Sequence, residues 1–177
     1  MTLWLALLLA TAPFSPAADK QESVEDMSTI QDEAALLEAI NTGWRWSGTV
    51  ITAVHDVSPM GHMLLSDAEG QYYYLDADGM QLTPLGDFAA ADEAMADPET
   101  QELWGGGELV RSARDKLGAP PAGHVFTLSP MHWIDGDYSA EHMIVLPLTE
   151  VAFLSGDLAR QLRDLPDGAR IQLKVND

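Results

Sequence analysis

Residues 62–85 read HMLLSDAEGQYYYLDADGMQLTPL, and this stretch decides the fold. Two short acidic turns that contain glycine, at 67–70 and 76–79, separate runs of apolar and aromatic residues. Such turns between β-type runs are typical of hairpins. The stretch therefore predicts a meander of antiparallel strands at 62–66, 71–75 and 80–85.

An aromatic and β-branched region precedes the meander. Trp44, Trp46 and the run at 49–54 have the composition of a strand, and residues 56–59 would end it. A period of two would place both tryptophans on one strand face, where core packing is their expected use. A carbohydrate platform, built with Trp104, Trp133 and the tyrosines at 72–74, is the alternative.

A helix is expected before this region. Ser28 stands in the N-cap position, and Gln31 three residues later completes a capping-box pattern. One apolar stripe at helical spacing follows, formed by Ile30, Ala34, Leu37 and Ile40. Residues 41–43, which end in glycine, predict the end of this helix.

The segment after the meander is predicted to be helical. Asp87 and Asp97 are the expected N-caps of two helices, and Pro98 suits the first position of the second. The expected spans are 88–95, a helix from 98, and 108–117 closed by Gly118. The glycine triplet at 105–107 lacks the strand and the Lys-Ser/Thr of a phosphate loop, so it is interpreted as a hinge between helices.

The last third alternates between strands and helices. Strands are expected at 124–129 and 143–146, with an irregular loop at 130–142 between them. Thr149 would cap a helix that Gly156 interrupts, and a final strand is expected at 169–175. The whole pattern predicts an α+β fold, a mostly antiparallel sheet with helices packed on one face.

The amino terminus has the features of an export signal. Residues 1–17 carry no charged side chain, residues 3–12 form an apolar run, and small residues at 15 and 17 suit a signal peptidase. We expect a signal peptide at 1–17, an acidic arm at 18–27 and a single domain at 28–177. The predicted location is periplasmic or secreted; a retained anchor and a buried apolar strand are the alternatives.

The charge balance is the strongest global signal. The chain has 28 Asp and Glu against 9 Lys and Arg, a formal net charge of −19, and no cysteine. This charge repels nucleic acid and anionic lipid and attracts a basic partner. The lack of cysteine excludes thiolate chemistry and disulfides. Solubility alone is the alternative explanation for the acidity.

Motifs for catalysis or metal binding are weak. The five histidines form no zinc pattern, although His132 and His142 flank an acidic loop. Asp76 and Asp78 before a glycine resemble the opening of a calcium loop, but the later ligands are missing, so a hairpin turn is the better interpretation. No serine nucleophile elbow occurs. Paired carboxylates cannot be ranked by sequence, and we expect no cofactor.

Three ordered segments resemble one family. Residues 61–75 (GHMLLSDAEGQYYYL), 123–130 (GHVFTLSP) and 158–168 (LARQLRDLPDG) resemble the Tdi-type immunity proteins of type VI secretion, over about residues 30–176. The resemblance implies a non-enzymatic protein that binds and neutralises a toxin, in some members a DNase. With an export signal, the toxin would instead act on the cell wall or membrane, or the domain would have been reused in another exported protein.

The sequence therefore favours a binding protein, not an enzyme. Its predicted partner is a toxin, as the resemblance implies, or another protein with a basic surface. The predicted partner-binding residues are Asp67, Glu69, Asp76, Asp78, Asp135 and Asp137. The alternatives are a wall- or glycan-acting hydrolase with paired carboxylates, and an envelope structural domain. Two carboxylates of raised pKa in a cleft beside stacked tryptophans would favour the hydrolase, and a flat acidic face the binding protein.

Overall fold

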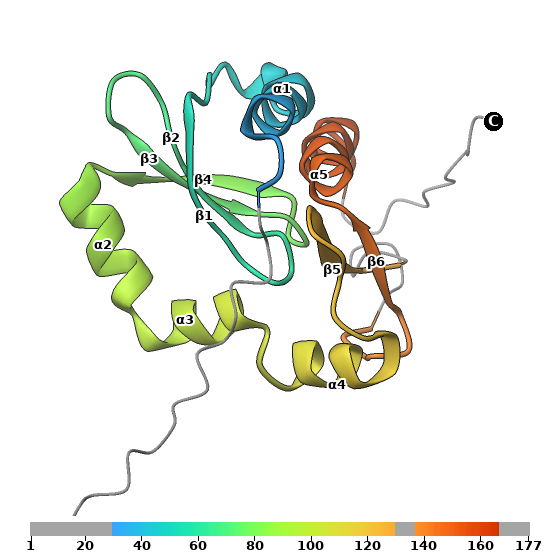
Figure 1. Cartoon of the computed structure of the whole chain (residues 1–177). Coiled ribbons are helices and arrows are strands. Elements are labelled where there is room, and N and C mark those ends of the chain that lie inside the picture. The colour runs from blue at the N-terminus through green and yellow to red at the C-terminus, as the bar shows by residue number, and fades with distance from the viewer. Residues whose placement is uncertain (1–29, 130–136, 167–177) are drawn as a thin grey trace, which may run out of the picture.

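A computed structural model describes residues 30–129 and 137–166 of the chain (Figure 1). The expectations for the signal peptide, the acidic arm, Ser28, Asp135 and the strand at 169–175 lie outside these residues. Within them, antiparallel sheets combine with helices, which confirms the α+β class.

The predicted meander is confirmed. Its four strands pair in chain order, each antiparallel to the next: β1 (Ala53–Val57), β2 (Met63–Ser66), β3 (Tyr72–Asp76) and β4 (Gln81–Gly86). The turn at 67–70 sets the register of β2 on β3, in which Met63 lies opposite Leu75. The first strand begins later than the β-branched run at 49–54 suggests, because that run is mostly an extended connection to β1.

A second, smaller antiparallel sheet stands beside the meander (Figure 1). It consists of β5 (His124–Leu128) and β6 (Met143–Pro147), at the two places where the sequence predicts strands. The backbone N–H of Phe126 donates to the carbonyl of Pro59 at 3.0 Å, which ties β5 to the turn between β1 and β2.

Two helices from opposite ends of the described chain pack together on the meander (Figure 1). They are α1 (Glu33–Gly43) and α5 (Leu148–Leu162). The predicted interruption at Gly156 is wrong, because α5 runs through it. A Cβ at Gly156 would lie 2.6 Å from the carbonyl carbon of Gly43, so this glycine allows the two backbones to touch.

The start of α1 and the structure after it also differ from prediction. Asp32 is the N-cap and accepts from the N–H of Ala35 at 3.0 Å, so the helix begins four residues later than the capping box at residue 28 indicates. Trp44 and Trp46 lie at and within the 3₁₀ turn η1 (Arg45–Ser47) and not on a strand. Their rings still stack, with centroids 5.7 Å apart. Trp44 is buried in the core, as its predicted use requires.

The middle of the chain forms three short helices, as the caps predict. They are α2 (Phe88–Ala96), α3 (Pro98–Gly105) and α4 (Gly107–Leu117). Asp87 and Asp97 accept from backbone N–H groups in the first turns of α2 and α3, and Gly118 ends α4. Gly106 adopts a left-handed conformation at the junction of α3 and α4, where the glycine triplet was expected to separate helices.

The two faces of the meander have different roles, because alternate strand residues point to opposite sides. Met63, Leu65 and Leu75 lie on the face that packs into the main core with α1 and α5. Tyr72 and Tyr74 lie on the other face, where they contact Phe88 of α2 and Trp104 of α3. The expected packing of helices on one face thus describes α1 and α5, and the helices α2 to α4 form the wall of a cavity over the second face.

Candidate functional site

A cavity of about 500 Å³ lies between the second face of the meander and the segment α2 to α4. Ligand pockets commonly have volumes of about 300–1,000 Å³, so this one is large enough for a side chain or a small molecule. Its wall contains the apolar side chains Met60, Leu85, Met95, Leu103 and Leu109. Its polar side includes two of the predicted residues, Asp76 and Asp78.

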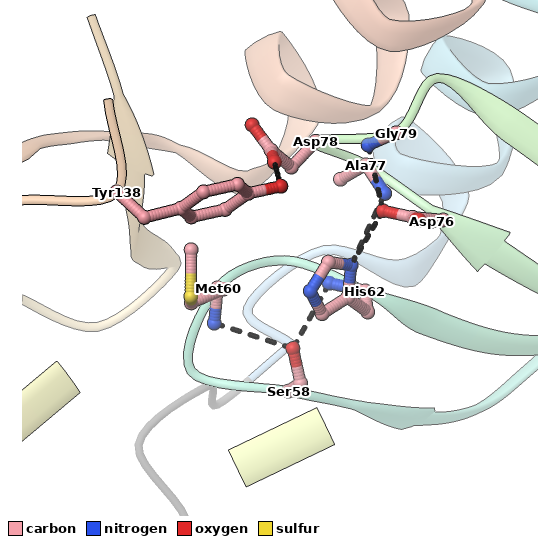
Figure 2. A network of polar contacts seen from close by, with 8 residues as sticks. All are labelled: Ser58, Met60, His62, Asp76, Ala77, Asp78, Gly79 and Tyr138. Atoms are coloured by element: carbon pink, nitrogen blue, oxygen red, sulfur yellow. Dashed lines mark hydrogen bonds and ion pairs between the residues drawn. The ribbon is translucent and has the colours of Figure 1, made fainter. Parts of the chain in front are cut away.

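The turn between β1 and β2 presents the first side of the cavity. Ser58 is fully buried, and its hydroxyl oxygen accepts from the N–H groups of Met60 and His62 at 3.2 and 3.0 Å (Figure 2). These bonds hold the turn in one conformation. Met60 and His62 therefore enter the cavity from a rigid support and not from a free loop.

A histidine and a carboxylate in the cavity lining lie next to each other (Figure 2). The Nδ1 atom of His62 lies 3.3 Å from Oδ1 of Asp76 and 3.2 Å from the N–H of Ala77. A neutral ring accepts from Ala77 at Nδ1, whereas a protonated ring can donate from the same nitrogen to Asp76. His62 and Asp76 therefore form a hydrogen-bonding pair in the lining of the cavity.

Asp76 is held as an anion by its surroundings. Burial raises the pKa of its carboxyl group, but the hydrogen bonds to His62 and to the N–H of Gly79 outweigh burial and keep the pKa below the ordinary 3.8. The carboxyl group of Asp76 also packs against the α-carbon of Gly79. A Cβ at residue 79 would overlap this carboxyl group. Asp76 is thus a fixed negative charge at neutral pH.

Asp78 is the more deeply buried of the two carboxylates, with 6% of the residue exposed. The hydroxyl of Tyr138 donates to its Oδ2 atom at 2.5 Å (Figure 2). Its Oδ1 atom has no hydrogen-bond donor in the described part of the chain. A buried carboxylate oxygen without a donor is costly, so this atom favours a donor supplied from outside the protein.

The pKa values of two tyrosines in the cavity lining are raised. Burial and then the charge of Asp76 raise the pKa of Tyr74 to about 12. Burial, the hydrogen bond to Asp78 and the charges of both aspartates also raise the pKa of Tyr138 above its ordinary 10.0. Both phenols therefore stay neutral at neutral pH.

Some of the predicted partner-binding residues line the cavity, and others lie far from it. Asp76 and Asp78 line it, and Asp137 is the chain neighbour of Tyr138. Asp67 and Glu69 lie in the turn at the opposite end of β3, about 15 Å away along a strand of that length. Their role in binding stays a prediction, as does that of Asp135.

Two of the predicted carboxylates already have partners of their own. Asp67 accepts from the N–H of Gln71 at 2.9 Å and from the hydroxyl of Tyr73 at 2.8 Å, which suits the structural role of a turn residue. Asp137 contacts Nδ1 of His142 at 2.7 Å. Asp78, which has an oxygen without a donor, is therefore better placed to bind a ligand.

The sequence analysis did not select His62 or Tyr138 as site residues, and it considered Tyr74 only for a carbohydrate platform. The position of His62 was predictable. The turn at 67–70 sets the register of the hairpin, and one more residue pair in that register places His62 opposite Asp76. Tyr74 then lies diagonally across from His62, and their rings stack with centroids 5.9 Å apart. Tyr138 belongs to a loop that is distant in sequence, and no local sequence pattern predicts its contact with Asp78.

The described residues contain no group of three or more His, Cys, Asp or Glu arranged to hold a metal ion. His132, one of the two histidines considered for a metal, lies outside them. None of the helices in the described ranges is both long enough and apolar enough to cross a bilayer.

Comparisons with known proteins assign no family to this chain. No family model matches the sequence, and a search of curated proteins finds no match. The resemblance to Tdi-type immunity proteins stays a prediction.

Proposed function

We propose that the protein is a non-enzymatic binding protein that captures a protein with a basic surface, in the periplasm or outside the cell. One observation carries the proposal: the 28 acidic residues outnumber the 9 basic ones, which gives a formal net charge of −19, and few of the carboxylates in the described ranges pair with an arginine. In the described ranges, three carboxylates pair with an arginine, namely those of Glu108, Asp157 and Asp164.

Charges that are not neutralised within the molecule act on what approaches it. They accelerate the encounter with a basic partner and repel nucleic acid and anionic lipid. A carboxylate-rich surface can also occupy a positive groove that would otherwise hold an anionic substrate. This is the behaviour expected of an immunity protein, and a toxin that attacks the cell wall or membrane is the partner that suits an exported one.

The cavity also permits a second candidate, a hydrolase, because His62 and Asp76 resemble an acid–base pair. Two features weigh against it. The lowered pKa of Asp76 is the reverse of what a general acid needs. The stacked pair Trp44 and Trp46 is absent from the cavity lining, and the Trp46 indole N–H donates instead to the Gly156 carbonyl of α5 at 2.9 Å.

Affinity capture tests the proposal. The immobilised protein is incubated with periplasmic extract at low and high salt, and the retained proteins are identified, purified and titrated calorimetrically. We expect a basic protein that binds at low salt, weakens steeply as salt rises, and loses its toxicity in the complex. Retention of no basic protein at low salt would refute the proposal. Turnover of wall or glycan substrates that Asp76→Asn abolishes would support the hydrolase instead.

A further inference from the structure

We propose that the cavity between the meander and α2 to α4 is the place where the captured protein inserts a lysine or arginine side chain. This inference rests on the proposed function and assigns it a site. The cavity combines apolar walls with acidic groups and, among the described residues, is lined by no lysine or arginine.

The acidic groups belong to two sets, one in or beside a strand turn and one on exposed helices. Asp76 and Asp78 lie on the polar side of the cavity, in and beside the β3–β4 turn. Glu102 of α3 and Glu108 of α4 lie on exposed helix surfaces that also line it. Glu108 already pairs with Arg111, whereas Glu102 has no ion pair in the described ranges. A cation that enters the cavity therefore meets carboxylates both at its exposed helices and on its polar side.

The apolar walls select the rest of the ligand. Lysine and arginine carry their charge on an aliphatic stem that packs on apolar surface. Met60, Leu103 and Leu109 provide such surface, and the ring of Tyr74 adds an aromatic wall that can attract a cation. An anion would be repelled, and a small inorganic cation would leave the apolar walls without a contact.

Asp78 supplies the independent observation. It is a buried carboxylate that lines the cavity, and its Oδ1 atom lacks a hydrogen-bond donor in the described ranges. An ammonium or guanidinium group brings N–H donors and a compensating charge at the same time. The hydroxyl of Tyr138 already donates to the other oxygen, Oδ2, so an incoming N–H donor would bind Oδ1.

Peptide titration tests the site on the full chain. The probes are a glycine-rich peptide with one arginine, the same peptide with neutral citrulline in its place, and butylguanidinium alone. Binding is measured by calorimetry at low salt. We expect the arginine peptide to bind at least tenfold more tightly than the citrulline peptide. We also expect it to bind more tightly than butylguanidinium, since the peptide adds contacts at the rim.

Matched charge variants locate the binding. Asp78→Asn should weaken the arginine peptide at least tenfold, and Glu102→Gln about threefold. Glu69→Gln removes the same charge at the far end of β3 and should change the affinity by less than twofold. Because Glu102 is exposed, its variant provides a test even if Asp78→Asn folds poorly.

Three results would overturn the assignment. Equal weakening by Asp78→Asn and Glu69→Gln would mean that charge acts over the whole surface, with no role for the cavity. Equal binding of the arginine and citrulline peptides would remove the cation from the recognition. Tighter binding of butylguanidinium than of the peptide would identify a small-molecule site. Failure of the proposed function is distinguishable, because a protein that captures no basic partner from periplasmic extract could still bind the peptide in the cavity.

Discussion

The contact between α1 and α5 makes a quantitative prediction at Gly156. A Cβ there would lie 2.6 Å from the carbonyl carbon and 2.8 Å from the carbonyl oxygen of Gly43, and 2.7 Å from the Cδ1 atom of Trp44. Normal contacts between such atoms lie at about 3.5–4.0 Å, so the helices must separate by about 1 Å. Two of the three atoms belong to backbone, which cannot rotate away as a side chain can.

The expected effect of Gly156→Ala follows from three contributions. Overpacking typically costs about 1–3 kcal/mol, and the stretched hydrogen bond from Trp46 to the carbonyl of residue 156 adds about 1 kcal/mol. The better helix propensity of alanine returns about 1 kcal/mol. We therefore expect a net loss of about 2 kcal/mol, which corresponds to a fall in Tm of roughly 4–8 °C for a domain of this size.

Urea and thermal unfolding, followed by far-UV circular dichroism and tryptophan fluorescence, measure this loss. Gly105→Ala is the matched control, since Gly105 is also helical and a Cβ there would have no atom within 4 Å beyond its chain neighbours and its own helix backbone. It should leave the free energy of unfolding unchanged or raise it by up to about 1 kcal/mol. Equal or greater stability of Gly156→Ala relative to the unmodified chain would refute the argument that the two backbones touch.

Three further predictions concern the cavity and α1. The folded pKa of Asp76 lies below 3.8, so its stabilisation is complete above about pH 4 and is lost as pH falls through the folded value; Asp76→Asn should flatten the acid side of a plot of urea midpoint against pH. Gly79→Ala should destabilise the chain by about 1–2 kcal/mol by displacing the carboxyl group of Asp76, and a double-mutant cycle with Asp76→Ala should remove most of that cost. Asp32→Ala should lower Tm through loss of about 1 kcal/mol at the N-cap, whereas Ser28→Ala, at the position that the sequence favours, should leave Tm unchanged.

The parts of the fold that depend on local signals were predictable. The turn at 67–70 determines a hairpin by itself, and Asp87 and Asp97 cap helices through bonds to residues three positions away. In each case the residues that form the structure are close in sequence, so the pattern contains the information. The start of α1 is an exception, because both Ser28 and Asp32 have the chemistry of an N-cap and the sequence does not distinguish them.

Features that depend on distant packing were not predictable. The sequence predicts a break at Gly156, since a helical glycine costs about 1 kcal/mol, and nothing nearby in the sequence indicates that α1 touches it. Trp44 and Trp46 have the composition of a strand, but their contacts with the core and α5 favour a 3₁₀ turn. Tertiary contacts overrode local preference at these positions.

The site was predictable in part. The sequence predicts Asp76 and Asp78 as partner-binding residues of a turn, and in the structure both line the cavity. The hairpin register predicts the pairing of His62 with Asp76. The opposite wall of the cavity comes from α3 and α4. Its position depends on how the chain folds back over the sheet, and the sequence does not specify that path.

The α1–α5 contact also orders the events of folding. The hydrogen bond from Trp46 to Gly156 joins positions 110 residues apart, whereas each hairpin of the meander joins neighbours. Closing so long a loop has a large entropic cost and is slow compared with forming a hairpin. A nascent chain can complete the meander once residue 86 has emerged, but it stays open at its amino end until most of α5 has been synthesised. Until α5 packs, the apolar face of the meander stays exposed to solvent. We expect a chaperone to bind the chain most strongly during this period.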